Sequence, residues 1–118
     1  MEIEDFINRS ALRERLNGDF KLFAELAGLF IKESPNLLDA VEKAVKTKNG
    51  EKIGKTAHTI KGAISNFSAD TAYNAALNLE NLGKNNELGM VDSAYKTLRE
   101  EVDHMKKALL MLIAENQL

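Results

Sequence analysis

One histidine stands in surroundings that favour a reaction at its ring. His58 lies in a stretch with helical spacing, and on a helix Gly54, Lys61 and Gly62 share its face. A glycine inside a helix costs on the order of 1 kcal/mol relative to alanine, so stability does not explain two of them beside one histidine. We therefore expect the glycines to leave room for a partner to approach the imidazole, which acts as a nucleophile.

The segments around His58 carry a family pattern. The run AHTIKG at 57–62 is followed by AISNF at 63–67, with LFIKESP at 29–35 before it and LENLG at 79–83 after it. In these segments the chain resembles the histidine-containing phosphotransfer (HPt) domains of two-component phosphorelays, although that family usually has glycine at the position of Ser68. The resemblance implies that His58 carries a phosphoryl group on a ring nitrogen and that Lys61 and Gly62 favour and expose it. It also implies that the partner is a receiver domain with a phosphorylatable aspartate.

Glu80 is the expected partner of the His58 ring. Glu80 follows Leu79 of one apolar stripe by one residue, just as His58 follows Ala57 of another, so the two side chains can face each other if these helices pack side by side. A carboxylate there can accept the ring N–H, fix the tautomer and make the other nitrogen more nucleophilic. We expect a hydrogen bond from Nδ1 of His58 to Glu80, with Nε2 facing solvent. The resemblance supports this, because HPt domains often have glutamate or glutamine at this position.

Three lysines can supply positive charge near the acceptor. Lys61 lies one turn from His58, where its ammonium can attract an incoming phosphoryl group and stabilise the phosphohistidine. Lys55 and Lys84 can extend this field as docking charges. By composition alone, each of the three is an ordinary surface lysine.

The second histidine has a different setting. His104 is followed by Met105 and has Glu101 and Lys107 within one turn, so nothing clears space around it and we interpret it as a surface residue. Two histidines on different helices, in a chain without cysteine, do not indicate a metal site.

The composition favours a single domain that spans residues 1–118. With 118 residues, 44% of them hydrophobic, the chain is large enough for one core and too small for two. A net charge of −2 argues against nucleic acid or an anionic membrane as a general partner. No apolar run approaches the roughly 20 residues that cross a bilayer, and the acidic N-terminus is unlike a signal peptide. We expect a monomeric, cytoplasmic domain whose partners are proteins.

The apolar residues recur at helical spacing, which predicts an all-α fold. We expect an antiparallel up-and-down four-helix bundle with a short N-terminal helix, from about residue 8 to 16, across one end. The first long helix should run from 20 to about 47 as a kinked but continuous helix, because the apolar phase does not shift at Pro35.

The remaining helices follow from the same spacing. A helix with a buried stripe from Ile53 to Phe67 should carry His58, and the next should begin at Ser68 or Asp70 and end at Gly83. After a loop at 84–90, a last helix should run from Val91 through at least residue 112.

The mechanism that we expect is nucleophilic transfer. Neutral His58 attacks the phosphorus of an aspartyl phosphate in a receiver domain, or takes the group from a sensor kinase, and later gives it to a second receiver. No nucleotide-binding motif occurs, so we expect a carrier without its own ATP site or cofactor, and not a complete enzyme. The receiver would supply Mg²⁺ and most of the in-line geometry.

Two alternatives stay open at this point. An N-terminal phosphoacceptor module of a chemotaxis-type histidine kinase would use the same histidine, but an ATP-binding domain would phosphorylate it. A helical adaptor without phosphotransfer would keep an apolar docking surface and have no need for His58 or its glycines.

Overall fold

The computed structural model describes residues 2–118, and within that range the chain forms helices and no strands. The five α-helices are α1 (Arg9–Arg15), α2 (Phe20–Lys46), α3 (Gly50–Ile64), α4 (Asp70–Lys84) and α5 (Val91–Glu115). Three short 3-10 helices accompany them: η1 (Ile3–Asp5), η2 (Ser65–Phe67) and η3 (Leu88–Met90). The all-α prediction is therefore confirmed.

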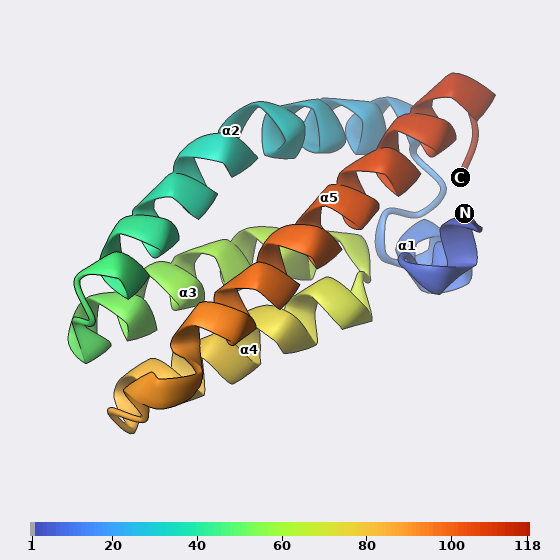
Figure 1. The fold of residues 1–118 in the computed structure, drawn as a ribbon. Helices are drawn as coiled ribbons and strands as arrows, with labels where there is room; N and C mark the ends of the chain where they lie inside the picture. The colour runs from blue at the N-terminus through green and yellow to red at the C-terminus, as the bar shows by residue number, and fades with distance from the viewer. Residues whose placement is uncertain (1) are drawn as a thin grey trace.

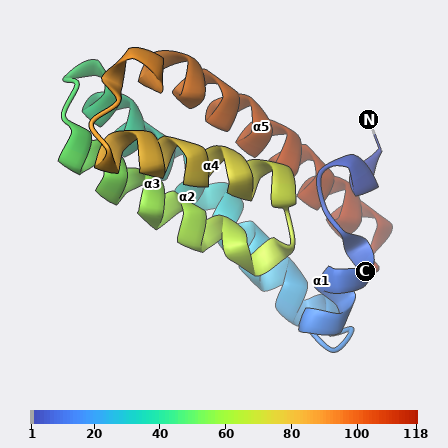
Figure 2. The ribbon, with the colours of Figure 1, turned by 90° about the horizontal axis from the view of Figure 1, so that it is seen from below.

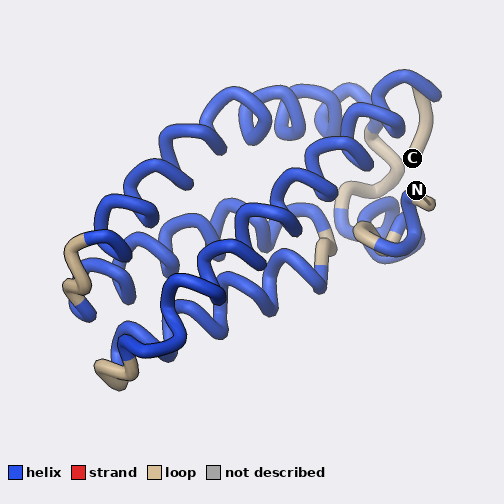
Figure 3. Tube along the Cα trace, viewed as in Figure 1, coloured by secondary structure: helices blue, strands red, loops and turns tan. Residues whose placement is uncertain are grey.

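The four long helices lie side by side, and each runs opposite to the one before it in the chain (Figures 1 and 2). The bundle measures 42 × 22 × 22 Å, and α1 lies across the end at which α5 finishes (Figure 1). Short connections turn the chain at the two ends of the bundle (Figure 3). Because α3 and α4 are consecutive and antiparallel, residues early in α3 lie beside residues late in α4.

Side-chain caps explain where the first three helices begin. Asn8, Asp19 and Asn49 each accept a hydrogen bond from the backbone N–H three residues later, at 3.0 Å. Such caps satisfy one of the four free donors at a helix N-terminus. The predicted starts of the short helix and of α2 are thereby confirmed.

Helix α2 continues through Pro35, as predicted, and bends along its length (Figure 1). Ser34, which fills the gap in the apolar stripe, is fully buried, and its hydroxyl donates to the carbonyl of Ile31 at 3.2 Å. The hydrogen bond satisfies a polar group that would otherwise be buried without a partner.

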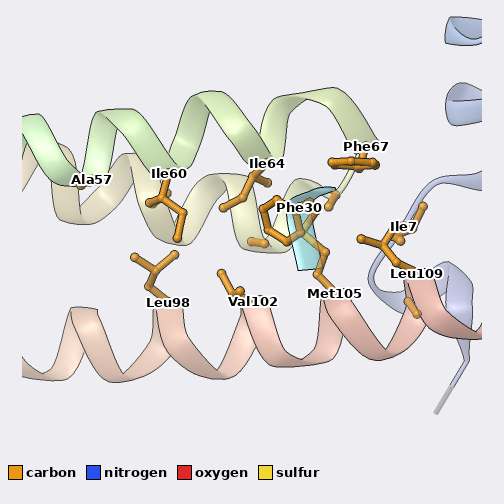
Figure 4. Packing of buried hydrophobic residues seen from close by; sticks show 14 of the residues in the cluster. Ile7, Phe30, Ala57, Ile60, Ile64, Phe67, Leu98, Val102, Met105 and Leu109 are labelled. Atoms are coloured by element: carbon orange, nitrogen blue, oxygen red, sulfur yellow. The ribbon is translucent and has the colours of Figure 1, made fainter. Parts of the chain in front are cut away.

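The core lies along the bundle axis and holds α3 in place. Ile60 and Ile64 of α3 point toward Leu98 and Val102 of α5, and all four side chains are completely buried (Figure 4). Ala57 belongs to the same buried stripe, and His58, one position further along, is left at the surface. The core therefore fixes which side of α3 faces outward.

The end of α4 differs from the prediction, because Gly83 does not end the helix. Helix α4 continues to Lys84, and the left-handed residue that follows is Asn86, with a φ of +55°. The backbone N–H groups of Asn86 and Glu87 donate to the carbonyls of Gly83 and Leu82, which is the hydrogen-bond pattern of a Schellman cap. Gly83 itself is buried against α3.

Ser68 occupies the turn between η2 and α4. Its φ of +53° lies in the left-handed region, where glycine has no steric penalty. Helix α4 begins two residues later, at Asp70, one of the two predicted starts.

Candidate functional site

The ring of His58 is held at one nitrogen and exposed elsewhere. The side chain is 65% exposed, and Nδ1 lies 2.8 Å from Oε2 of Glu80. This contact is the one predicted from the positions of the two residues beside their apolar stripes. With Glu80 ionised, Nδ1 carries the hydrogen and donates it, which leaves Nε2 as the nitrogen with a free lone pair.

Glu80 is a buried carboxylate that accepts from three side chains: the His58 ring and the ammonium groups of Lys61 and Lys84. Its side chain is only 2% exposed. Nζ of Lys61 lies 2.7 Å from Oε1, and Nζ of Lys84 lies 2.8 Å from Oε2. Burial by itself would raise the pKa of Glu80, but the hydrogen bonds from Lys61, Lys84 and His58 outweigh it and lower the pKa to about 2. Glu80 is therefore ionised at neutral pH.

Lys61 is directed toward Glu80 more than toward open solvent. Its side chain is 16% exposed, and Nζ lies 5.8 Å from the centroid of the Tyr73 ring. The hydrogen bond to Glu80 is the largest influence on its pKa, and the net result is a raised pKa despite desolvation. Lys61 thus stays protonated and fixes the carboxylate that in turn holds His58.

Lys84 and Lys55, the two other candidate cations, lie in different situations. Lys84 is 60% exposed and binds the same oxygen of Glu80 that accepts the His58 N–H. Lys55 forms a solvent-exposed ion pair with Glu51 at 3.0 Å, one turn away on the same helix. The structure brings Lys61 and Lys84 together with His58 around Glu80, and it leaves Lys55 at the edge of the site.

The two glycines beside His58 have different surroundings. Gly62 is exposed, and a methyl group added there would meet nothing within 4 Å, so this patch is bare as predicted. Gly54 is buried, and an added methyl group would lie 3.2 Å from Cγ of Lys84. The expectation that both glycines clear space holds for Gly62, whereas Gly54 packs against α4.

His58 lies between two depressions of different character. On one side a shallow hollow is lined by Gly54, His58, Thr59, Gly83, Lys84 and Asn86, among others. On the other side of α3 an apolar groove is lined by residues that include Leu26, Leu29, Phe30, Thr59, Ala63 and Phe67. Leu29 is 57% exposed at this groove.

Sequence reasoning missed the contacts of Tyr73 and Lys84 with this network. Both lie on the face of α4 that carries Glu80, seven residues before it and four residues after it. Helical periodicity alone places residues at these separations on one face, so the signal was present in the sequence.

His104 lies away from this site, near the N-terminal segment. Its ring centroid is 4.7 Å from that of Phe6, and Nδ1 is 3.7 Å from a carboxylate oxygen of Glu101. It is half-buried, so its interpretation as a simple surface residue was incomplete. Among residues 2–118 no group of three side chains is arranged to hold a metal ion. None of the helices in that range combines the length and the apolar character needed to span a membrane.

Comparison with known proteins gives a consistent result. The family model described as "Hpt domain" matches residues 25–108, which include His58 and Glu80. A crystal structure of histidine-containing phosphotransfer protein B (HptB) from Pseudomonas aeruginosa PAO1 is similar, with 18% identity, 94% of each chain covered and a TM-score of 0.79. The HPT domain of the Hpt sensor hybrid histidine kinase from Shewanella is also similar, with 14% identity, 92% of this chain and 94% of that chain covered, and a TM-score of 0.78. No curated protein matches the chain.

Proposed function

The chain belongs to the Hpt domain family, and from this membership and the geometry around His58 we propose that it is a phosphorelay carrier that holds a phosphoryl group on Nε2 of His58. The single observation that carries the assignment to this atom is the 2.8 Å contact between Nδ1 and Glu80 on a ring that is otherwise exposed. A histidine held in this way has one defined tautomer and one accessible nucleophilic nitrogen.

The reaction needs little from this protein beyond presentation of the nitrogen. The Nε2 lone pair attacks the phosphorus of an aspartyl phosphate in a receiver domain, a P–N bond forms, and the P–O bond to the aspartate breaks to release its carboxylate. The Nδ1–H remains donated to Glu80, which stabilises the positive charge that develops on the ring. In the reverse step the aspartate of another receiver attacks the same phosphorus and the P–N bond breaks.

The partners that fit this chemistry are receiver domains, with a sensor histidine kinase as an alternative donor. The bare surface at Gly62 and the apolar groove beside Leu29 offer a receiver room to dock beside His58. The Mg²⁺ that receiver domains use would come with the partner. We expect the carrier to act as a monomer.

The deciding experiment is phosphotransfer from candidate receivers of the same genome to purified protein. We expect the wild type and the control variant His104→Gln to accept an acid-labile phosphate, and His58→Gln to accept none. A His58→Gln protein that is still phosphorylated, or one that still signals in cells, would contradict the proposal and favour an adaptor role.

A further inference from the structure

Three glycines form the contact between the beginning of α3 and the end of α4. A methyl group added at Gly83 would lie 2.7 Å from the backbone nitrogen of Gly54 and 2.8 Å from the carbonyl oxygen of Gly50. A methyl group added at Gly50 would lie 2.7 Å from the carbonyl oxygen of Gly83. At this point the two backbones lie in contact, with the side chains of Ile53 and Asn86 beside them.

This backbone contact is next to the pair of residues at the site. On α3, His58 follows Gly54 by four residues, and on α4, Glu80 precedes Gly83 by three. Since the helices are antiparallel and lie side by side (Figure 2), moving one turn along each helix leads from the glycine contact to the His58–Glu80 hydrogen bond. The distance between the helix axes at the glycines therefore determines how far Glu80 must reach.

The His58 ring has little else to hold it against Glu80. It is 65% exposed, so packing around the ring does not place it, and the hydrogen bond depends on where the two backbones lie. The separation of packed helices follows the size of the side chains at their contact, and glycine allows the smallest separation. An added methyl group at Gly83 meets two backbone atoms and, at 2.8 Å, Cγ2 of the fully buried Ile53, and none of these can turn aside as the end of a flexible side chain can.

We propose that Gly83, with Gly54 opposite it, is a positioning residue for phosphotransfer: the backbone contact sets the helix separation at which Glu80 holds Nδ1 of His58. This inference rests on the proposed function of His58 as phosphoacceptor. Gly83 would act through the position of Glu80 and would not itself contact the phosphoryl group.

The test compares Gly83→Ala with Gly28→Ala, both in a His104→Gln background. Gly28 lies within α2, and a methyl group there would meet nothing within 4 Å, so it is the matched control. The chain has two histidines, so the background variant leaves His58 as the only source of imidazole signals. Nitrogen NMR of the ring then reports the tautomer and the Nδ1–H hydrogen bond, and phosphorylation by a small phosphoramidate donor reports the reactivity of Nε2.

We expect the His58 ring signals of Gly28→Ala to match those of the background protein. In Gly83→Ala we expect the Nδ1–H signal to shift toward that of a free imidazole and phosphorylation to slow about tenfold, which is the lower end of the effect of losing an orienting partner. Gly54→Ala should fold even if Gly83→Ala does not, because its methyl group chiefly meets the Lys84 side chain, and it should show a smaller shift in the same direction.

Folded Gly83→Ala with ring signals and a rate equal to those of the control would overturn the inference. If Gly83→Ala does not fold, unchanged ring signals in Gly54→Ala would overturn it in the same way. The NMR measurement needs no phosphoryl group, so it stays distinct from the proposed function: an unphosphorylated wild type would contradict the function and leave the geometric test intact.

Discussion

Lys84 and His58 meet at one oxygen of Glu80, because Nζ of the lysine and Nδ1 of the histidine each lie 2.8 Å from Oε2. The lysine therefore helps to keep ionised the carboxylate on which the histidine depends. Lys61 holds the other oxygen at 2.7 Å. The site is a small network centred on Glu80, and each of its members can be tested separately.

Lys84→Met should raise the pKa of Glu80 from about 2 toward its ordinary value of 4.5, because one of the hydrogen bonds that lower it is removed. Titration of the Glu80 carboxyl carbon by NMR measures this change. Since Lys84 is largely exposed, the free energy of unfolding should change by less than about 1 kcal/mol. Lys55→Met is the matched control, because Lys55 pairs with Glu51 alone, and an equal rise in that variant would contradict the assignment.

Glu80→Ala should slow phosphorylation of His58 by about 10- to 100-fold, since the ring loses the group that fixes its tautomer. Glu80→Gln keeps a carbonyl oxygen that accepts the Nδ1–H, so its rate should lie between those of wild type and Glu80→Ala. Rates measured with one receiver under single-turnover conditions test this order. Circular dichroism should show that both variants keep the bundle, and equal rates for the two variants would argue against an orienting hydrogen bond.

Gly62→Ala should fold at least as well as the wild type, with a gain of up to about 1 kcal/mol in the free energy of unfolding, because alanine is the better helix former and the added methyl group meets nothing. Gly62→Gln should slow transfer from a receiver, since the larger side chain lies on the approach to His58. The same variant should react at the wild-type rate with a small phosphoramidate, because this donor does not dock on the surface at Gly62. An unchanged rate with the receiver would show that the partner does not come near Gly62.

The pH dependence of stability should reveal the buried carboxylate. The pKa of Glu80 is about 2 in the folded protein, below its ordinary value of 4.5, so the unfolded chain takes up the proton first as the pH falls. The stabilising contribution of Glu80 is complete above about pH 4.5 and is lost as the pH falls through about 2. Urea unfolding of wild type and Glu80→Gln should show the largest advantage of the wild type near neutral pH and a smaller one at about pH 3. A difference that does not change with pH would refute this contribution.

Much of the fold follows from local signals in the sequence. The spacing of apolar residues predicted the helices, and the position of Glu80 one residue beside Leu79 predicted its contact with His58. These predictions succeed because each depends on periodicity within one helix, with a single assumption about which helices are neighbours.

The roles of the glycines could not be read in the same way. Gly83 was expected to end a helix and Gly54 to clear space, but both lie where two backbones meet. In the sequence, a glycine looks the same whether it caps a helix, leaves a bare surface patch or lies at a contact between two helices. Only the packing of α3 on α4 distinguishes these three roles. The contact of His104 with Phe6 was missed for the same reason, since the two residues lie almost a chain length apart.

The exposure of His58 on a single face of α3 has a consequence for the order of events in a relay. In the proposed relay, one accessible nitrogen accommodates one partner, so a donor and an acceptor compete for the same place and the carrier must release the first before it meets the second. Turnover should then follow ping-pong kinetics, with inhibition by an excess of unphosphorylated donor. The abundance of each partner in the cell would thus set the direction of phosphoryl flow as much as its affinity does.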